Sequence, residues 1–314
     1  MDTRTVQALV RFGLGRRGSE ALPSDPAAWL HSQLHAPPAT PSGPIPTGPM
    51  PPAAATGSDA APNSAAGLEA LRADLREKPP PGQSRARALY RGDATAALSA
   101  ALTTPAPFRE RLVWFWANHF TVSVRRGVCA ALIGPFIAEA VRPHVVGRFE
   151  DMLLAVMRHP AMLLYLDNAA SIGPESPAGR RTGRGINENL ARECLELHTV
   201  SPAAGYTQAD VTSFANILTG WSVEVKQDPP GFRFRDRAHE PGAKMLIGRS
   251  FPPGEEGGVQ ALAFLASHPK THRFLAAKLA CHFVADDPPV EVVRHIEGTL
   301  RDTSGDLGAA AHSL

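Results

Sequence analysis

The sequence predicts a mainly α-helical protein, a multi-helix globular array with one small β-hairpin insert. Apolar residues recur at spacings of three and four along most of the chain, which is the pattern of amphipathic helices. Strand-like alternation is confined to a stretch of about residues 222–247. The chain has 314 residues, of which 43% are hydrophobic, so it can bury a substantial core.

The N-terminal part divides into two stretches. Residues 1–35 predict a short helical segment. Residues 36–67 consist mostly of Pro, Ala, Gly, Ser and Thr, and a stretch with so few large apolar side chains cannot bury enough surface to order itself. We therefore predict a flexible linker or surface loop there.

The glycines at positions 13, 15 and 18 match the GxGxxG fingerprint of dinucleotide-binding folds. That fingerprint requires a preceding strand, whereas residues 6–12 have a helix-like pattern. The match therefore does not favour a nicotinamide or flavin site.

Residues 68–314 predict a helical domain that contains the hairpin. Pro160 interrupts the periodic pattern and suits the first position of a new helix. Strands at Ser222–Val225 and Phe232–Phe234 flank a Pro/Gly turn, and Met245–Ile247 is a candidate third strand. The predicted helices cover residues 68–75, 89–102, 108–119, 130–141, 149–157, 161–166, 187–198, 207–221, 256–267, 270–284 and 290–300.

The charge and the cysteine content limit which kinds of partner, metal site and compartment the sequence is compatible with. The formal net charge is +2, so no overall field directs the chain to nucleic acid or an anionic membrane. Cys129, Cys194 and Cys281 lie far apart and are predicted to be buried free thiols. No segment has the pattern of a secretory signal or a membrane span. These patterns predict a cytoplasmic protein without a membrane partner and leave export open.

The helix predicted over residues 187–198 has the most chemistry-like pattern. At about 100° per residue, its carboxylates and Asn189 share one face, and His198 lies on the apolar face. The polar face could bind a divalent cation through oxygen ligands, or one carboxylate, Glu193 or Glu196, could act as a general base. The candidate metal ligands are Glu188, Asn189, Glu193 and Glu196.

The same helix also has a simpler interpretation. Glu188, Arg192 and Glu196 follow one another at intervals of four, as in a solvated charge ladder of little energetic value. Only a distorted helix end would bring His198 to the carboxylates. Any active site must therefore be completed by other segments.

A Gly/Arg stretch at residues 179–185 leads into this helix. A helix N-terminus presents free N–H groups, and arginines add bidentate donors, so Arg180, Arg181 and Arg184 are candidate ligands for phosphate or carboxylate. Mobile, solvated Gly/Arg loops have the same composition.

Four further residues are candidates. His119 shares a helix face with apolar residues, where a histidine is more often structural than catalytic. Asp167 follows a helical run and belongs either to a turn or to a cleft, where it would be catalytic together with His119, Glu193 and Glu196. Asn118 lies off the apolar face, and His239 lies in a loop that looks exposed.

A series of segments along the chain is similar to a known family. The segments are FRERLVWFWANHF at 108–120, HPAMLLYLD at 159–167, NENLARE at 187–193, LELHT at 195–199, GYTQADV at 205–211 and LTGW at 218–221. In this order they resemble the bacterial family called domain of unknown function 1800, from about residue 11 to residue 289. The resemblance implies no activity.

The resemblance carries three further implications. Family members generally continue beyond the point where this chain stops, which implies that a C-terminal helical part is missing here. Cys194 stands where the family more often has an aliphatic residue, in agreement with burial. Relatives are often encoded beside a second, exported protein, which implies a protein partner.

Two function hypotheses follow, and a third has less support. The first is a hydrolase-like enzyme with a Glu/Asn/His-lined cleft, with or without a divalent cation, that acts on an anionic or polymeric substrate. The second is a non-catalytic helical scaffold that binds another protein. Nucleic-acid binding is third, because only the arginine stretch favours it.

Overall fold

The structure, a computed structural model, describes residues 2–18, 20–36, 62–80 and 82–314. In these ranges helices form most of the chain and strands occur only in two small antiparallel hairpins, so the predicted fold class is confirmed. Most of the predicted linker, residues 37–61, lies outside the described residues. Helix α3 begins at Ser64, earlier than the predicted linker end at residue 67, because Asn63 caps it by accepting a hydrogen bond from the Ala66 N–H.

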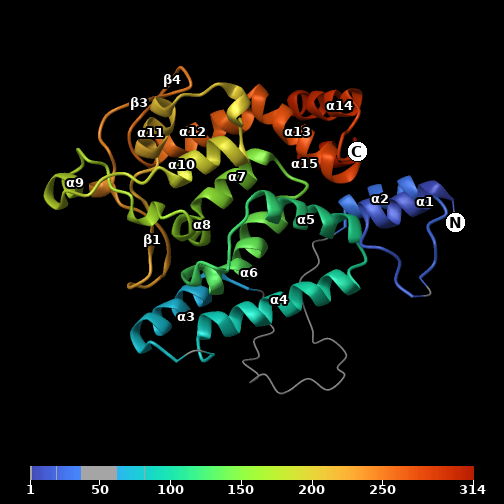
Figure 1. Cartoon of the computed structure of the whole chain (residues 1–314), viewed down its shortest axis with the longest axis horizontal. Helices are drawn as coiled ribbons and strands as arrows, with labels where there is room; N and C mark the ends of the chain where they lie inside the picture. The colour runs from blue at the N-terminus through green and yellow to red at the C-terminus, as the bar shows by residue number, and fades with distance from the viewer. Residues whose placement is uncertain (1, 19, 37–61, 81) are drawn as a thin grey trace.

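Most of the described helices coincide with predicted ones (Figure 1), but α9 and α15 were not predicted, and the helix predicted over residues 130–141 is divided into a 3-10 turn, α6 and a π-helical turn. In the first half they are α1 (Thr3–Gln7), α2 (Pro26–Leu34), α3 (Ser64–Glu77), α4 (Arg85–Thr103), α5 (Pro107–His119), α6 (Ile133–Phe136), α7 (Phe149–Arg158) and α8 (Pro160–Tyr165). In the second half they are α9 (Pro177–Thr182), α10 (Asn189–Glu193), α11 (Gln208–Ile217), α12 (Glu255–Ser267), α13 (Pro269–Phe283), α14 (Val290–Asp302) and α15 (Leu307–His312). Among these described helices, none has the length and apolar character needed to cross a bilayer.

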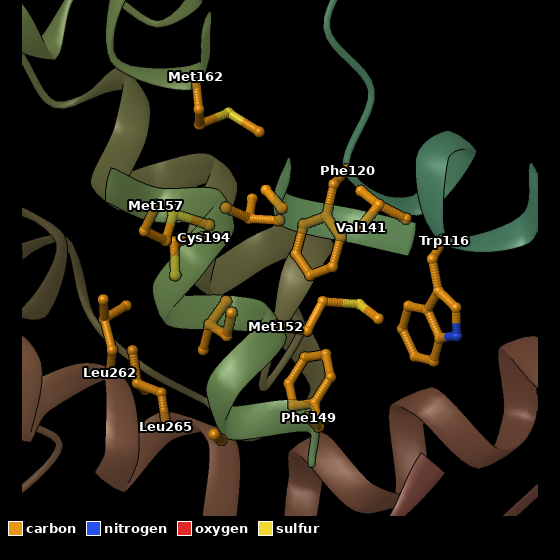
Figure 2. Close-up of a cluster of buried hydrophobic side chains, with 14 of the residues drawn as sticks. Trp116, Phe120, Val141, Phe149, Met152, Met157, Met162, Cys194, Leu262 and Leu265 are labelled. Atoms are coloured by element: carbon orange, nitrogen blue, oxygen red, sulfur yellow. The ribbon is translucent and has the colours of Figure 1, made fainter. Parts of the chain in front are cut away.

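Helix α7 lies at the centre of the core and packs against α8 and α12. The side chains on its inner face, among them Phe149 and Met152, have no exposed surface. In Figure 2 these two lie beside Trp116 of α5 and Phe120, and Cys194, Leu262 and Leu265 belong to the same apolar cluster.

The cysteines differ from the prediction at one position. Cys129 and Cys194 are buried free thiols as predicted, but Cys281 is exposed. Burial raises the pKa of the Cys129 thiol to about 12 and that of Cys194 also rises, so both stay protonated at neutral pH.

Two His-Pro corners join helices in the same way. The Nδ1 atoms of His159 and His268 accept hydrogen bonds of 3.1 Å from the backbone N–H groups of Ala161 and Lys270, and so cap α8 and α13. The proline that follows each histidine occupies a first helical position, as predicted for Pro160. The backbone torsions agree, with φ −68° and ψ 134° at one corner and φ −67° and ψ 135° at the other.

The strands form two hairpins instead of one three-stranded insert. Strand β1 (Trp221–Glu224) pairs with β2 (Gly231–Phe234) around the predicted turn. The predicted third strand is β3 (Lys244–Leu246), which pairs with β4 (Arg249–Phe251). The positive φ values of Ile247 (46°) and Gly248 (74°) fold β3 back onto the strand that follows it, so it does not join the first hairpin.

The N-terminal helices dock on α5 and α13. The Gln33 side-chain oxygen accepts a hydrogen bond of 2.7 Å from the Phe108 N–H, and Arg109 donates one of 2.9 Å to the Leu34 carbonyl. The ring of Phe12 lies 5.5 Å from that of Phe108 and 5.7 Å from that of Phe283. Residues 8–12 form a π-helical turn, so the glycines at positions 13–18 do not follow the strand that a dinucleotide-binding fold requires.

Candidate functional site

A cavity of about 230 Å³ brings together polar side chains from helices that are distant in sequence. We call it the His119 cavity. Its lining residues come from the ends of α5, α8 and α10, from the turns that follow these helices and from α13. They are Asn118, His119, Thr121, Tyr165, Leu166, Glu193, Leu197, His198 and Lys278.

The helix predicted over residues 187–198 is not a regular α-helix. Helix α10 covers Asn189–Glu193, and a π-helical turn covers Cys194–His198. In an α-helix, residues five apart differ by about 140°. A π-helical turn is closed by hydrogen bonds between residues five apart and brings such residues nearer to one face. Glu193 and His198 therefore line the same cavity, and the prediction that His198 opposes every carboxylate is wrong for Glu193.

His119 is held between a lysine and a helix end. Its Nδ1 atom lies 2.9 Å from Lys278 Nζ, and its Nε2 atom lies 3.2 Å from the backbone oxygen of His198. An ammonium group only donates, so Nδ1 accepts and Nε2 carries the proton that is donated to the carbonyl. That carbonyl belongs to the last turn of the helix, whose oxygens lack partners within the helix.

Burial keeps the groups around His119 uncharged or less basic than usual. It lowers the pKa of the fully buried His119 imidazole well below its ordinary range, and the charges of Lys278 and His198 lower it further. Burial likewise lowers the pKa of His198 to about 3 and lowers that of the Lys278 ammonium. The cavity therefore holds neutral imidazoles and a lysine that loses its proton more readily than a solvated one.

Glu193 is the one acid that lines the His119 cavity among the described residues. Its burial and the neighbouring charge of Glu196 raise the pKa of its carboxyl group. A half-buried carboxylate with a raised pKa can take a proton from water and return it, which is the property of a general acid–base.

A family model described as "Protein of unknown function (DUF1800)" matches residues 7–314. The chain belongs to the DUF1800 family. This confirms the resemblance found in the sequence. No curated protein and no solved structure matches the chain. Because the family description assigns no activity, function has to be argued from the residues of the site.

Glu188 lies outside the cavity of this DUF1800 chain. Its carboxylate accepts hydrogen bonds from Arg192 at 2.8 Å, from Gln208 at 2.9 Å and from Thr212 at 2.6 Å, so it ties α10 to α11. This contact with Arg192 is the first step of the charge ladder considered in the sequence. Asn189 is exposed at the start of α10.

The proposed metal ligands are not brought together as one set. The Glu188 carboxylate is hydrogen-bonded between α10 and α11, whereas Glu193 lines the His119 cavity. Within residues 2–18, 20–36, 62–80 and 82–314, no group of three or more His, Cys, Asp or Glu side chains is arranged to hold a metal ion. A divalent cation stays a prediction for this chain.

Asp167 and His239 occupy structural positions. Asp167 forms an ion pair with Arg126 and has a left-handed backbone with φ 59°, which agrees with the turn interpretation. His239 is only 6% exposed, so its predicted exposure in a loop is wrong. Its Nδ1 donates to the Thr219 carbonyl at 2.8 Å and its Nε2 accepts from the Gly254 N–H at 2.8 Å, and both ring nitrogens are used in holding the loop.

The candidate anion-binding arginines are exposed, and they lie partly in α9 and partly in the irregular segment that follows it. Arg180 and Arg181 belong to α9, so this part of the predicted loop is helical. Arg180 pairs with Glu175 at 3.1 Å, and Arg184 donates to the Ala170 carbonyl at 3.2 Å. None of the three lines the His119 cavity.

The sequence did not single out Lys278, Tyr165 or Thr121. Lys278 interrupts an otherwise small and apolar stretch of α13, which is the one feature that could have drawn attention to it. Its contact with His119 spans 159 positions of sequence and depends on how α13 packs beside α5.

Proposed function

We propose that this DUF1800 chain is a hydrolase whose catalytic centre is the His119 cavity. The environment of the Lys278 amino group is the observation that supports this proposal. This amino group contacts a neutral imidazole at 2.9 Å, no described carboxylate lies within ion-pair distance of it, and Glu193 lines the same cavity. A half-buried amino group without a counter-ion favours a ligand that carries or develops negative charge.

The chemistry assigned to these residues is attack of water on a carbonyl carbon. The Glu193 carboxylate takes a proton from water as the hydroxide oxygen bonds to the carbon. The Lys278 ammonium stabilises the negative charge that develops on the carbonyl oxygen. The protonated Glu193 then gives its proton to the leaving group as the bond to that group breaks. His119 is a positioning residue, because it acts by holding Lys278.

The dimensions of the cavity limit the substrate. A volume of about 230 Å³ is below that of a typical drug-sized site, so the cavity admits only the reacting part of a larger molecule or a small one. Asn118, Thr121 and Tyr165 add hydrogen-bonding groups that can orient it. These properties favour small polar esters or amides that carry a negative charge.

The test compares two glutamates of the same helical region. We expect wild-type protein to hydrolyse at least one member of a panel of small anionic carboxylic esters and amides. Glu193→Gln and Lys278→Met should each lower kcat/KM by about 100-fold or more, because a general base and an oxyanion donor each contribute about that much. Glu188→Gln, outside the cavity, should stay within about threefold of wild type. A folded wild-type protein that hydrolyses none of the panel, or a Glu193→Gln variant that matches Glu188→Gln, would overturn the proposal.

The scaffold hypothesis has one observation in its favour. Glu188, Arg192 and Gln208 form a surface network that joins two helices and needs no ligand. The polar face of α10 is thus accounted for in part by packing, and the enzyme proposal rests on the residues of the cavity alone.

A further inference from the structure

A second, more apolar cavity lies between α4, α5 and α6 and has no part in the proposed hydrolysis. It has a volume of about 330 Å³ and is lined mainly by Tyr90, Leu98, Trp114, Ile133 and Ile137. We call it the Asp93 pocket. Leu98 and Trp114 are 54% and 45% exposed, so two large apolar side chains at its rim are left open to solvent by the described part of the chain.

The carboxylate of Asp93 is an unusual group in this apolar pocket. No described residue donates a hydrogen bond to this carboxylate, and none forms an ion pair with it. The position of the side chain depends on a glycine, because a Cβ atom at Gly134 would overlap Asp93 Oδ2. Burial without a partner raises the pKa of the Asp93 carboxyl group to about 6, so the group is mostly ionised at pH 7.5.

The other charged group of the pocket does not balance Asp93. Arg142 also lines the cavity, but its guanidinium is bonded to the buried carboxylate of Glu110, with Nη2 at 2.8 Å from Oε1. These two charges neutralise each other. The pocket therefore combines an aromatic and aliphatic wall with one unbalanced negative charge.

We propose that the Asp93 pocket binds a small apolar amine, with the ammonium group on the Asp93 carboxylate and the apolar body against Trp114 and Leu98. An ammonium group supplies both the donors and the charge that the carboxylate lacks. The aromatic side chains at the wall also favour a cation, because their ring faces are electron-rich. The volume fits a ligand of one ring and a short chain.

Three probes of nearly equal shape separate charge from shape. They are phenethylamine, its neutral analogue 2-phenylethanol, and phenylacetate, which carries the opposite charge. Binding to the full chain is measured at pH 7.5 by ligand-observed NMR and calorimetry. We expect phenethylamine to bind at least about tenfold more tightly than 2-phenylethanol, and phenylacetate to bind more weakly than both.

Two variants test whether phenethylamine binds in the Asp93 pocket. Asp93→Asn should weaken phenethylamine binding by about tenfold and leave 2-phenylethanol binding unchanged. Gly134→Ala should displace the carboxylate and weaken amine binding as well. Asp286→Asn, at an exposed aspartate remote in sequence, is the matched control and should bind phenethylamine as wild type does.

The proposal is overturned if the amine and the alcohol bind equally, if Asp93→Asn binds the amine as wild type does, or if no probe binds at 10 mM. None of these results concerns the esters and amides of the hydrolase assay, so the two proposals succeed or fail separately. A circular dichroism spectrum equal to that of wild type shows that Asp93→Asn is folded.

Discussion

At the scale of single residues, the pair of His119 and Lys278 determines whether the proposed catalytic lysine is held in place. His119→Asn keeps a side-chain oxygen near the position of Nδ1, and this oxygen can accept the hydrogen bond from Lys278, whereas His119→Ala leaves the lysine without it. We expect His119→Ala to lower kcat by about tenfold or more and His119→Asn to recover a substantial part of that loss. The comparison is made on the best substrate of the ester and amide panel. Equal rates for the two variants would contradict a positioning role.

Asp93 should make stability depend on pH in the direction opposite to most carboxylates. Its pKa is raised from 3.8 to about 6, so between these values the folded state binds more protons than the unfolded state, and stability is lost as the pH rises through this window. The other titratable groups of the pocket are Tyr90 and Arg142, and Arg142 is paired with Glu110. We expect Asp93→Asn to be more stable than wild type at pH 7.5, by roughly 1 kcal/mol after allowance for partial exposure.

Urea titrations at several pH values measure this effect. The difference between Asp93→Asn and wild type should shrink as the pH falls from 7 toward 4, because the aspartate of the folded protein then becomes neutral. A difference that stays constant over this range would show that Asp93 is not the group responsible. Asp286→Asn again serves as control.

Only some residues of the candidate site could be predicted from the sequence. His119, Asn118, Glu193 and His198 could be singled out, because their residue types and their places on predicted helices were visible. Lys278 could not, because its role depends on a contact with a residue 159 positions away. Asp167 was visible as an acid at a helix end, but its pairing with Arg126 depends on tertiary structure in the same way.

At the scale of elements, apolar periodicity located most of the longer helices but not the short helices α9 and α15 or the irregular helical turns. The apolar spacing located α5, α7, α12 and α13 to within a few residues. The π-helical turn at Cys194–His198 leaves no recognisable spacing of apolar residues in the sequence, because it is a single wider turn that follows directly on an α-helix. The partner of β3 was also not predictable from alternation, since the positive φ at Ile247 and Gly248 decides which strand it meets.

The His-Pro corners provide a prediction at this scale. His268 caps α13 through Nδ1, and an asparagine can make the same bond, whereas an alanine cannot. We expect His268→Ala to lower the free energy of unfolding by about 1 kcal/mol and His268→Asn to lower it by less than half as much. His295→Ala, at an exposed position of α14, is the matched control and should change stability by less than about 0.5 kcal/mol. If His268→Asn is as unstable as His268→Ala, the histidine stabilises the corner by packing and not as a cap.

At the scale of the whole molecule, the N-terminal segment is joined to the rest by specific contacts in spite of the long Pro/Ala/Gly-rich stretch that follows it in the sequence. Figure 1 shows α2 beside α15, with α1 next to α2, and α2 packs on α5 and α15. Gln33 and Arg109 complete this attachment with two hydrogen bonds between α2 and α5. Contacts of this kind predict that the N-terminal helices and the helical core unfold together.

Phe12 tests that expectation. Its ring is stacked on Phe283 of α13 and meets Phe108 of α5 edge to face, so it joins the first turns of the chain to two core helices. We expect Phe12→Ala to lower the free energy of global unfolding by about 2 kcal/mol, since a half-buried aromatic side chain and its ring pairs are lost. Urea unfolding followed by both tryptophan fluorescence and circular dichroism should show one transition, shifted to lower urea. Val10→Ala, 58% exposed in the same turn, should leave the midpoint almost unchanged. A Phe12→Ala midpoint equal to that of Val10→Ala would mean that the segment detaches before the core unfolds.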